Sequence, residues 1–138
     1  MIYECVSIKR DVVEADEFDK GERALLNFGH TCGHAIEKLW NYQTVSHGEA
    51  VGMGMVMITH AGEHLGITEA GTCRRISQLL TRYGMKTRDA HTTEEIVAAM
   101  SADKKRTNSG IKLIMLKSVG DSFIKTVTNE DLPSVFGL

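Results

Sequence analysis

One segment of this 138-residue chain is apolar around nearly the whole circumference of a predicted helix. Ser46 and Glu49 have the S-x-x-E spacing of a capping box, which marks the start of a helix. The residues from Ala50 to Leu65 then place Val, Met, Ile and Ala side chains on every side of that helix. Because a helix that is apolar all round is usually buried, this segment predicts a central helix. The rest of the chain must therefore pack around it.

The residues before this helix predict another one. Asp19 and Glu22 are spaced to cap a helix that continues to Trp40. Its apolar residues recur at helical spacing: Leu25, Leu26, Ala35, Ile36, Leu39 and Trp40. Residues 41–45 are predicted to form a connecting loop.

Two further helices are predicted after the central one. The third helix runs from about Glu69 to Tyr83, with Gly84 as its stop. Thr92 and Glu95 form another capping box, for a short helix. The apolar face of the third helix consists of Ile76, Leu79, Leu80 and Tyr83. The apolar residues of the short helix are Ile96, Val97 and Met100.

The pattern changes after Ala102. Residues 111–116 and 123–127 are predicted as short strands, joined into a hairpin through Gly120 and Asp121. A short helix is predicted around Leu132 to Phe136. The fold class is therefore mainly α: one multi-helix domain over residues 1–138, with a small β-hairpin.

Composition excludes several classes of protein. Sixteen Lys and Arg against eighteen Asp and Glu give a formal net charge of -2, so nothing favours nucleic-acid binding. The sequence contains no run of about eighteen apolar residues, so it predicts no membrane span. The first ten residues lack the pattern of a signal peptide. Three scattered cysteines without a CxxC motif indicate reduced thiols, and we expect a cytoplasmic protein.

The densest cluster of polar residues lies between Arg23 and His47. On one continuous helix, the spacing of Arg23, Asn27, His30 and His34 places all four on one face. A cation, an amide and two imidazoles are costly to bury together without a ligand or a metal. The alternative is that each histidine is hydrogen-bonded locally and that this face is solvated.

Histidines four residues apart on a helix can chelate one metal ion, so His30 and His34 are candidate ligands. His47 could add a third nitrogen from the next helix, and an imidazole site with an open position suits catalytic zinc. His60 and His64 have the same spacing, but they lack the accompanying polar residues and are interpreted as surface or interface residues.

Glycines accompany the cluster. Gly29 and Gly33 remove side chains beside the two imidazoles and would allow a backbone or a ligand to approach. Gly52 and Gly54 in the central helix are interpreted as sites of close helix packing. The stretch Asp103-Lys104-Lys105-Arg106 fits either an anion clamp or a solvated loop.

These stretches closely resemble the 3-dehydroquinate synthase family. The resemblance lies in residues 23–37 (RALLNFGHTCGHAIE) and 47–56 (HGEAVGMGMV). Residues 7–21 resemble the segment that precedes them in the family, and Asp103-Lys104-Lys105 with Gly110-Ile111 resembles its C-terminal part. The match extends over nearly the whole chain.

The resemblance implies a two-domain enzyme with a fold like that of glycerol dehydrogenase. An N-terminal α/β domain binds NAD, and this chain corresponds only to the helical C-terminal domain. The implied metal ligands are His30 and His47, with a glutamate from the first domain. The metal would be zinc, or another divalent ion such as cobalt. His34 would then contact substrate and not the metal. The further residues implied to contact substrate are Lys9, Arg23, Asn27, and one or both of Lys104 and Lys105.

The implied activity is that of a phosphate-eliminating lyase that depends on NAD and zinc. It converts 3-deoxy-D-arabino-heptulosonate 7-phosphate to 3-dehydroquinate and phosphate in the shikimate pathway of aromatic amino acid biosynthesis. The intact enzyme is expected to be a homodimer. The 138-residue chain alone is expected to be inactive, because the NAD-binding domain and one metal ligand are missing.

Two alternatives remain. Another sugar phosphate cyclase, of the 2-deoxy-scyllo-inosose or valiolone synthase type, would share the histidine motifs but use a substrate without a carboxylate. The basic residues Lys9, Arg23, Lys104 and Lys105 favour the carboxylate-bearing substrate. The other alternative is a non-catalytic helical module that assembles with a separate NAD-binding domain.

Overall fold

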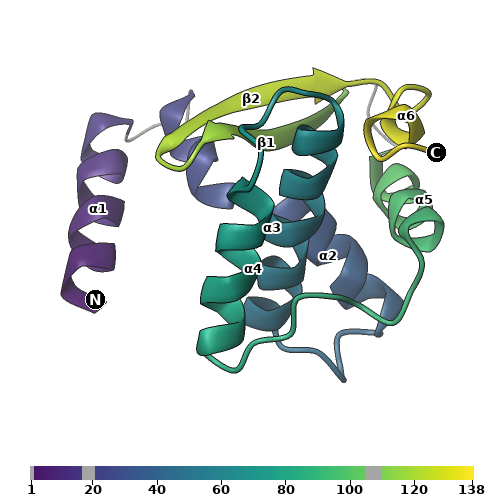
Figure 1. Ribbon diagram of the computed structural model, residues 1–138, viewed down its shortest axis with the longest axis horizontal. Helices are drawn as coiled ribbons and strands as arrows, with labels where there is room; N and C mark the ends of the chain where they lie inside the picture. The colour runs from purple at the N-terminus through teal and green to yellow at the C-terminus, as the bar shows by residue number, and fades with distance from the viewer. Residues whose placement is uncertain (1, 17–20, 105–109) are drawn as a thin grey trace.

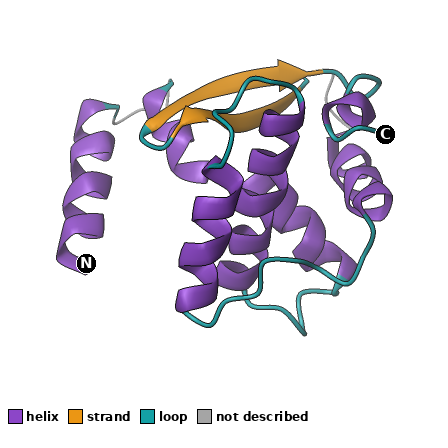
Figure 2. Cartoon of the chain, viewed as in Figure 1, coloured by secondary structure: helices purple, strands orange, loops and turns teal. Residues whose placement is uncertain are grey.

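The computed structural model describes residues 2–16, 21–104 and 110–138. Helices dominate these residues, and a two-stranded antiparallel hairpin lies across one end of the helical body (Figures 1 and 2). The elements are, in chain order, α1 (Ile2–Ala15), the 3₁₀ helix η1 (Glu22–Asn27), α2 (His30–Leu39), α3 (His47–His64), α4 (Thr72–Arg82), α5 (Thr93–Lys104), β1 (Ile111–Ser118), β2 (Asp121–Val127) and α6 (Leu132–Val135). The predicted fold class is confirmed.

The helix α3 lies at the centre, as its apolar circumference predicts. It packs against α2, α4 and β1, and Ala50 and Ile58 are among its buried side chains. Its capping box is formed, since the Ser46 hydroxyl accepts a hydrogen bond from the Glu49 backbone N–H. The Ser46 N–H in turn donates to the Glu49 carboxylate over 3.1 Å. The start of α3 is therefore fixed, as expected of a capped helix.

The predicted continuous helix from Asp19 to Trp40 is wrong. Asp19 lies outside the described residues, and the chain forms the 3₁₀ helix η1 before it breaks at Phe28 and Gly29. Gly29 has a φ of 81°, a left-handed conformation that glycine adopts readily, and it precedes the first turn of α2. A Cβ atom on Gly29 would lie 2.7 Å from the Val51 carbonyl oxygen, so the break lets the chain pass close to α3.

Helices α2 and α3 meet through three glycines, Gly29, Gly33 and Gly54, which we call the glycine contact. A Cβ atom on Gly33 would lie 3.0 Å from the Val51 Cα atom. A Cβ atom on Gly54 would lie 2.9 Å from the Gly33 nitrogen and closer still to the Gly29 carbonyl oxygen. The prediction that glycines permit close backbone approach is therefore confirmed here.

Helix α4 begins three residues later than predicted. The Glu69 N–H donates instead to the Lys117 carbonyl oxygen over 2.7 Å, which holds the loop before α4 against β1. Ile76 and Leu80 of the predicted apolar face are half-buried, whereas Leu79 and Tyr83 are exposed. The turn after α4 includes Gly84, with a φ of 71°, so the predicted stop is confirmed.

The predicted capping box of α5 is also formed. The Thr92 N–H donates to the Glu95 carboxylate over 2.7 Å, and the Glu95 N–H donates to the Thr92 hydroxyl over 3.3 Å. The helix continues to Lys104, beyond the Ala102 boundary taken from the sequence. Lys105 and the rest of the predicted turn up to residue 109 lie outside the described residues.

The predicted hairpin and the short terminal helix are both confirmed, with longer strands than expected. Ile111 pairs with Val127, and Met115 pairs with Phe123. Gly120 adopts a φ of 91° in the turn between the strands. Strand β1 buries side chains in the core that includes α3, namely Ile111, Leu113 and Met115.

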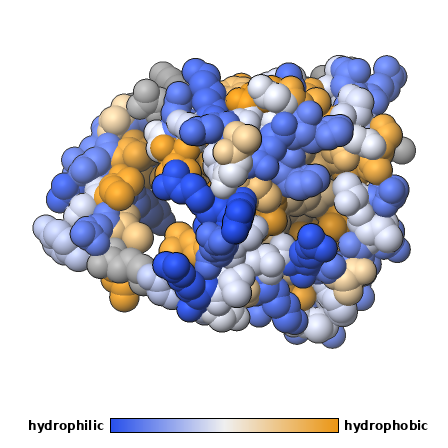
Figure 3. Space-filling model, viewed as in Figure 1, coloured by the Kyte–Doolittle hydropathy of each residue, from blue (hydrophilic) through white to orange (hydrophobic). Residues whose placement is uncertain are grey.

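Helix α1, which the sequence does not mark as a separate element, stands beside the body (Figure 1). It has no buried residue, and its exposed apolar side chains include Ile2, Tyr3, Val6 and Ile8. Apolar surface is visible over this helix in Figure 3. The Asp16 carboxylate accepts hydrogen bonds from the N–H groups of Gly21 and Arg23, which attaches α1 to η1. None of the described helices is long and apolar enough to cross a membrane.

Candidate metal centre

The imidazoles of His30, His34 and His47 converge where the first turns of α2 and α3 lie close together. The ring centroids of His30 and His47 lie 5.2 Å apart, those of His30 and His34 5.7 Å, and those of His34 and His47 5.8 Å. His30 and His34 occupy successive turns of α2, while His47 is the first residue of α3. The predicted convergence of the three histidines is confirmed.

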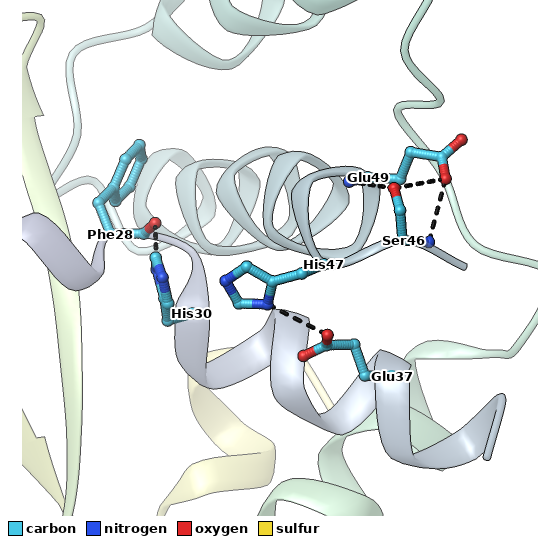
Figure 4. A network of polar contacts seen from close by, with 6 residues as sticks. All are labelled: Phe28, His30, Glu37, Ser46, His47 and Glu49. Atoms are coloured by element: carbon cyan, nitrogen blue, oxygen red, sulfur yellow. Dashed lines mark hydrogen bonds and ion pairs between the residues drawn. The ribbon is translucent and has the colours of Figure 1, made fainter. Parts of the chain in front are cut away.

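His30 and His47 each direct Nδ1 at an oxygen atom. Nδ1 of His30 lies 3.4 Å from the Phe28 carbonyl oxygen, and Nδ1 of His47 lies 3.1 Å from Oε1 of Glu37 (Figure 4). With a proton on Nδ1, each ring keeps the Nε2 lone pair available. Histidines that bind metals in proteins usually show this arrangement, in which the second nitrogen is hydrogen-bonded.

Glu37 brings a carboxylate into the cluster. One ligand atom from each of His34, Glu37 and His47 lies within 4.8 Å of the others. Imidazole nitrogens with a carboxylate oxygen form a donor set suited to zinc and similar divalent ions. The described residues therefore offer two overlapping donor sets, one with His30 and His47 and one with His34, Glu37 and His47.

The cluster opens to the surface. The His47 side chain is 56% exposed, whereas the Glu37 side chain is 12% exposed. A hollow of about 120 Å³ beside His34 lies between α2 and α5. Ligand pockets for small molecules commonly enclose about 300–1,000 Å³, so this hollow is too small to enclose a seven-carbon phosphorylated substrate.

Two neighbouring ionisable groups are less suited to bind a metal ion. Cys32 is buried, and burial raises the pKa of its thiol to about 12. Because the thiolate is the form that binds metals, a thiol with this pKa is a poor ligand at neutral pH. Hydrogen bonds from Ser46 lower the pKa of Glu49, and its carboxylate is engaged in the capping box.

The predicted polar stripe on one helix is wrong, because the chain breaks at Gly29. Arg23 and Asn27 lie on η1, where Arg23 is half-buried and Asn27 is exposed. The 3₁₀ helix leads directly to His30, so both residues stay on the segment that enters the cluster. Their orientation relative to the imidazoles differs from that on one continuous α-helix.

Of the predicted lysines, only Lys9 has a described side chain, and it does not join the cluster. Lys9 is exposed on α1, and no described contact links it to the imidazoles. Lys104 ends α5 with a side chain outside the described part of the structure, and Lys105 lies outside it altogether. His60 and His64 are exposed on the later turns of α3, as predicted for surface residues.

Glu37 is the member of the cluster to which the sequence assigned no role. The available signal was its spacing, three residues after His34 and seven after His30, which places it on the same face of α2. Its contact with His47 crosses the loop between two helices. Helical spacing alone therefore did not reveal the pair.

Residues 1–106 match the family model described as 3-dehydroquinate synthase C-terminal. The chain belongs to this family. A 3-dehydroquinate synthase from Clostridium perfringens is 48% identical over 132 residues, which cover 94% of this chain and 37% of that protein. A 3-dehydroquinate synthase from Enterococcus faecalis is 39% identical over 133 residues, which cover 96% of this chain and 37% of that protein. The chain thus spans little more than a third of the length of these curated relatives.

Two solved structures share the fold of this chain. A 2-deoxy-scyllo-inosose synthase complexed with carbaglucose-6-phosphate, NAD+ and Co2+ gives a TM-score of 0.76 at 23% identity, over 96% of this chain and 39% of that one. A 2-epi-5-epi-valiolone synthase from Streptomyces hygroscopicus, with NAD+ and Zn2+ bound, gives a TM-score of 0.72 at 18% identity. That match covers 91% of this chain and 35% of the other. At these identities the likeness concerns the fold.

Proposed function

We propose that this chain supplies the metal- and substrate-binding part of a 3-dehydroquinate synthase. The reaction would convert 3-deoxy-D-arabino-heptulosonate 7-phosphate to 3-dehydroquinate and phosphate in the shikimate pathway. Family membership supports the activity. The structural observation that carries the site is the pair His30 and His47, each with Nδ1 directed at an oxygen and Nε2 left open.

His30 and His47 are the proposed metal ligands in this chain. Their donor chemistry suits zinc or another divalent ion such as cobalt, and a glutamate from an N-terminal domain would complete three protein ligands. When bound, the metal would polarise substrate hydroxyls and orient them. His34, whose Nδ1 has no described hydrogen bond, is then open to contact substrate.

The cationic and amide residues are proposed to orient the anionic substrate. Arg23 and Asn27 lie on the segment that enters the cluster, and Lys9, Lys104 and Lys105 are the further candidates. A substrate with a phosphate and a carboxylate has two anionic ends. Holding both ends fixes the reacting carbons relative to the metal, which is catalysis by positioning.

The remaining parts of the enzyme are proposed to come from an N-terminal NAD-binding domain. The chain spans 37% of its curated relatives, and the imidazole cluster opens to the surface. NAD would be bound mainly by that domain and would supply the hydride chemistry. We therefore expect the chain alone to be inactive. The resemblance to the family is the basis for proposing that the complete enzyme is a homodimer. The three free cysteines support a cytoplasmic location.

A second candidate is another sugar phosphate cyclase. The structural neighbours include 2-deoxy-scyllo-inosose and valiolone synthases, which supports this alternative. Identity favours the first candidate, because the 3-dehydroquinate synthases reach 48% whereas these cyclases reach 23%.

The deciding experiment is a hybrid enzyme. This chain replaces the matching 132-residue region of the Clostridium perfringens relative, and the hybrid is assayed with NAD, zinc and each sugar phosphate. We expect turnover of the carboxylate-bearing heptulosonate phosphate and none of a hexose 6-phosphate. The opposite preference would favour the second candidate.

The zinc content of the same hybrid tests the proposed ligands. His30→Ala and His47→Ala are expected to lower bound zinc and turnover at least tenfold. The exposed pair His60→Ala and His64→Ala should leave both unchanged. Equal zinc content in all four variants would contradict the proposed ligands.

A further inference from the structure

We propose that Glu37 is a positioning residue that orients His47 for the metal. Its carboxylate holds the proton on Nδ1 of His47 and thereby leaves Nε2 as the metal-binding atom. This inference deepens the proposed function, because it rests on His47 being a ligand. Glu37 lies on α2, whereas the ligand that it would orient, His47, lies on α3.

The geometry gives Glu37 control over the imidazole. Oε1 of Glu37 lies 3.1 Å from Nδ1 of His47, a normal hydrogen-bond distance. The Glu37 side chain is 12% exposed, and it projects from α2 beside the buried residues Ala35 and Ile36. The acceptor therefore belongs to an element fixed in the core.

His47 has little packing of its own to orient its ring. Its side chain is 56% exposed at the first turn of α3, where the neighbouring Gly48 has no side chain. The described contacts of the ring are with Glu37, His30 and His34. Of these three, only the Glu37 carboxylate forms a hydrogen bond with the ring, as the acceptor for Nδ1 of His47.

The chemistry of the pair favours one tautomer. A free neutral imidazole prefers its proton on Nε2, which would block that atom as a ligand. A carboxylate acceptor at Nδ1 reverses this preference, increases the electron density on Nε2 and fixes the ring plane. Such partners typically change metal affinity about 10- to 100-fold when they are removed.

A direct ligand role for Glu37 is the competing arrangement. The ligand atoms of His34, Glu37 and His47 lie within 4.8 Å of one another. In the structure, however, the carboxylate faces Nδ1 of His47 as a hydrogen-bond acceptor (Figure 4). The two roles make different predictions for the same substitutions.

The first test measures the tautomer of His47 in the metal-free 138-residue chain. Nitrogen-15 NMR at alkaline pH should show Nδ1–H on His47 in the native chain. Glu37→Ala should shift His47 to the Nε2–H form, whereas Glu37→Gln should retain Nδ1–H because the amide oxygen still accepts. Glu94→Ala, which removes an exposed carboxylate of α5, is the matched control. An Nε2–H tautomer in the native chain, or no response to Glu37→Ala, would overturn the proposal.

The second test measures Co²⁺ affinity and the visible spectrum of the bound ion in the hybrid enzyme. Glu37→Ala should weaken binding about 10- to 100-fold, and Glu37→Gln should weaken it less. In a His47→Ala background, Glu37→Ala should cause no further loss. A further loss there, with a changed Co²⁺ spectrum, would show a direct ligand and overturn the positioning role.

These tests separate the two proposals. If the hybrid is inactive while the His47 tautomer follows Glu37, the proposed function fails and the hydrogen-bond role stands. If His30→Ala abolishes metal binding while Glu37→Ala leaves both affinity and tautomer unchanged, the metal site stands and Glu37 has no positioning role. Circular dichroism on each variant verifies that it is folded.

Discussion

Gly54 lies where the backbones of α2 and α3 come closest. A methyl group there would meet the Gly33 nitrogen at 2.9 Å, and the Gly29 carbonyl oxygen at a still shorter distance. Both obstacles are backbone atoms, which cannot rotate away as a side chain can. The two helices would therefore have to separate to admit it, and His30 and His47 would separate with them.

We expect Gly54→Ala to lower the free energy of unfolding by about 1–3 kcal/mol, the usual cost of overpacking. Gly48→Ala is the control on the same helix, because a Cβ atom there meets nothing within 4 Å. That change should be neutral or stabilising by up to about 1 kcal/mol, since alanine favours the helix. Urea unfolding followed by circular dichroism measures both. Equal stability of the two variants would show that the glycine contact is not tight.

Sequence spacing predicted some residue roles and missed others. Gly29, Gly33 and Gly54 were predicted to permit close approach, because glycines within helices are costly and need a reason. Glu37 received no role, because its partner His47 lies across a loop. Local periodicity cannot reveal a hydrogen bond between two helices.

At the scale of elements, the connection between α4 and α5 is held through one carboxylate. The Asp89 side chain is 4% exposed and accepts hydrogen bonds from the Trp40 indole at 2.8 Å and from the His91 backbone at 2.9 Å. Nδ1 of His91 lies 2.6 Å from the same carboxylate. Burial raises the pKa of Asp89, but the hydrogen bonds from His91 and Trp40 outweigh it and leave the pKa below its ordinary value.

We expect Asp89→Ala to lower the free energy of unfolding by about 1–3 kcal/mol at pH 7, because buried donors lose their acceptor. A lowered pKa means that the ionised group stabilises the fold above its ordinary pKa of 3.8, and that this contribution is lost as pH falls through the folded value. The difference between native and variant should therefore shrink in acid. Asp121→Ala, which removes an exposed carboxylate, should have little effect at either pH.

Fluorescence provides the measurement, since Trp40 is the single tryptophan of the chain. Loss of its hydrogen bond to Asp89 should change the emission of the folded variant before any urea is added. Unchanged emission and unchanged stability would mean that the connection is held by other contacts.

Most elements could be predicted from caps and periodicity, but one boundary could not. The capping boxes at Ser46 and Thr92 and the turn at Gly120 are local signals, and each was correct. The break at Gly29 depends on the backbone of α3, which lies far along the chain. Because apolar spacing looks the same on both sides of the break, the sequence predicted one helix and placed Arg23 on the same helix as His30.

At the scale of the whole molecule, α1 differs from every other long helix. It buries no residue and contacts the body through η1. Since tertiary packing supplies most of the stability of helices in proteins, a 14-residue helix with so little packing should open readily.

We expect the backbone amides of α1 to exchange with deuterium at least a hundredfold faster than those of α3 in the 138-residue chain. Hydrogen exchange followed by mass spectrometry resolves the two segments. Helix α4, which packs against α3 but keeps an exposed face, should be intermediate. Protection of α1 equal to that of α3 would show that the helix is held more firmly than its contacts indicate.

The candidate site was predictable in part at this scale. Convergence of His30, His34 and His47 follows from motif spacing and a short loop, and the structure confirms it. The walls that would enclose a substrate could not be inferred from a chain that spans 37% of its relatives.

The glycine contact also has a consequence for heating. Side chains gain rotamer freedom as temperature rises, so a spacing set by packed side chains drifts gradually. A spacing set by touching peptide groups has no rotamers to gain. The separation of His30 and His47 should therefore hold steady on warming until α2 and α3 part, and the proposed metal site should then be lost in one abrupt step.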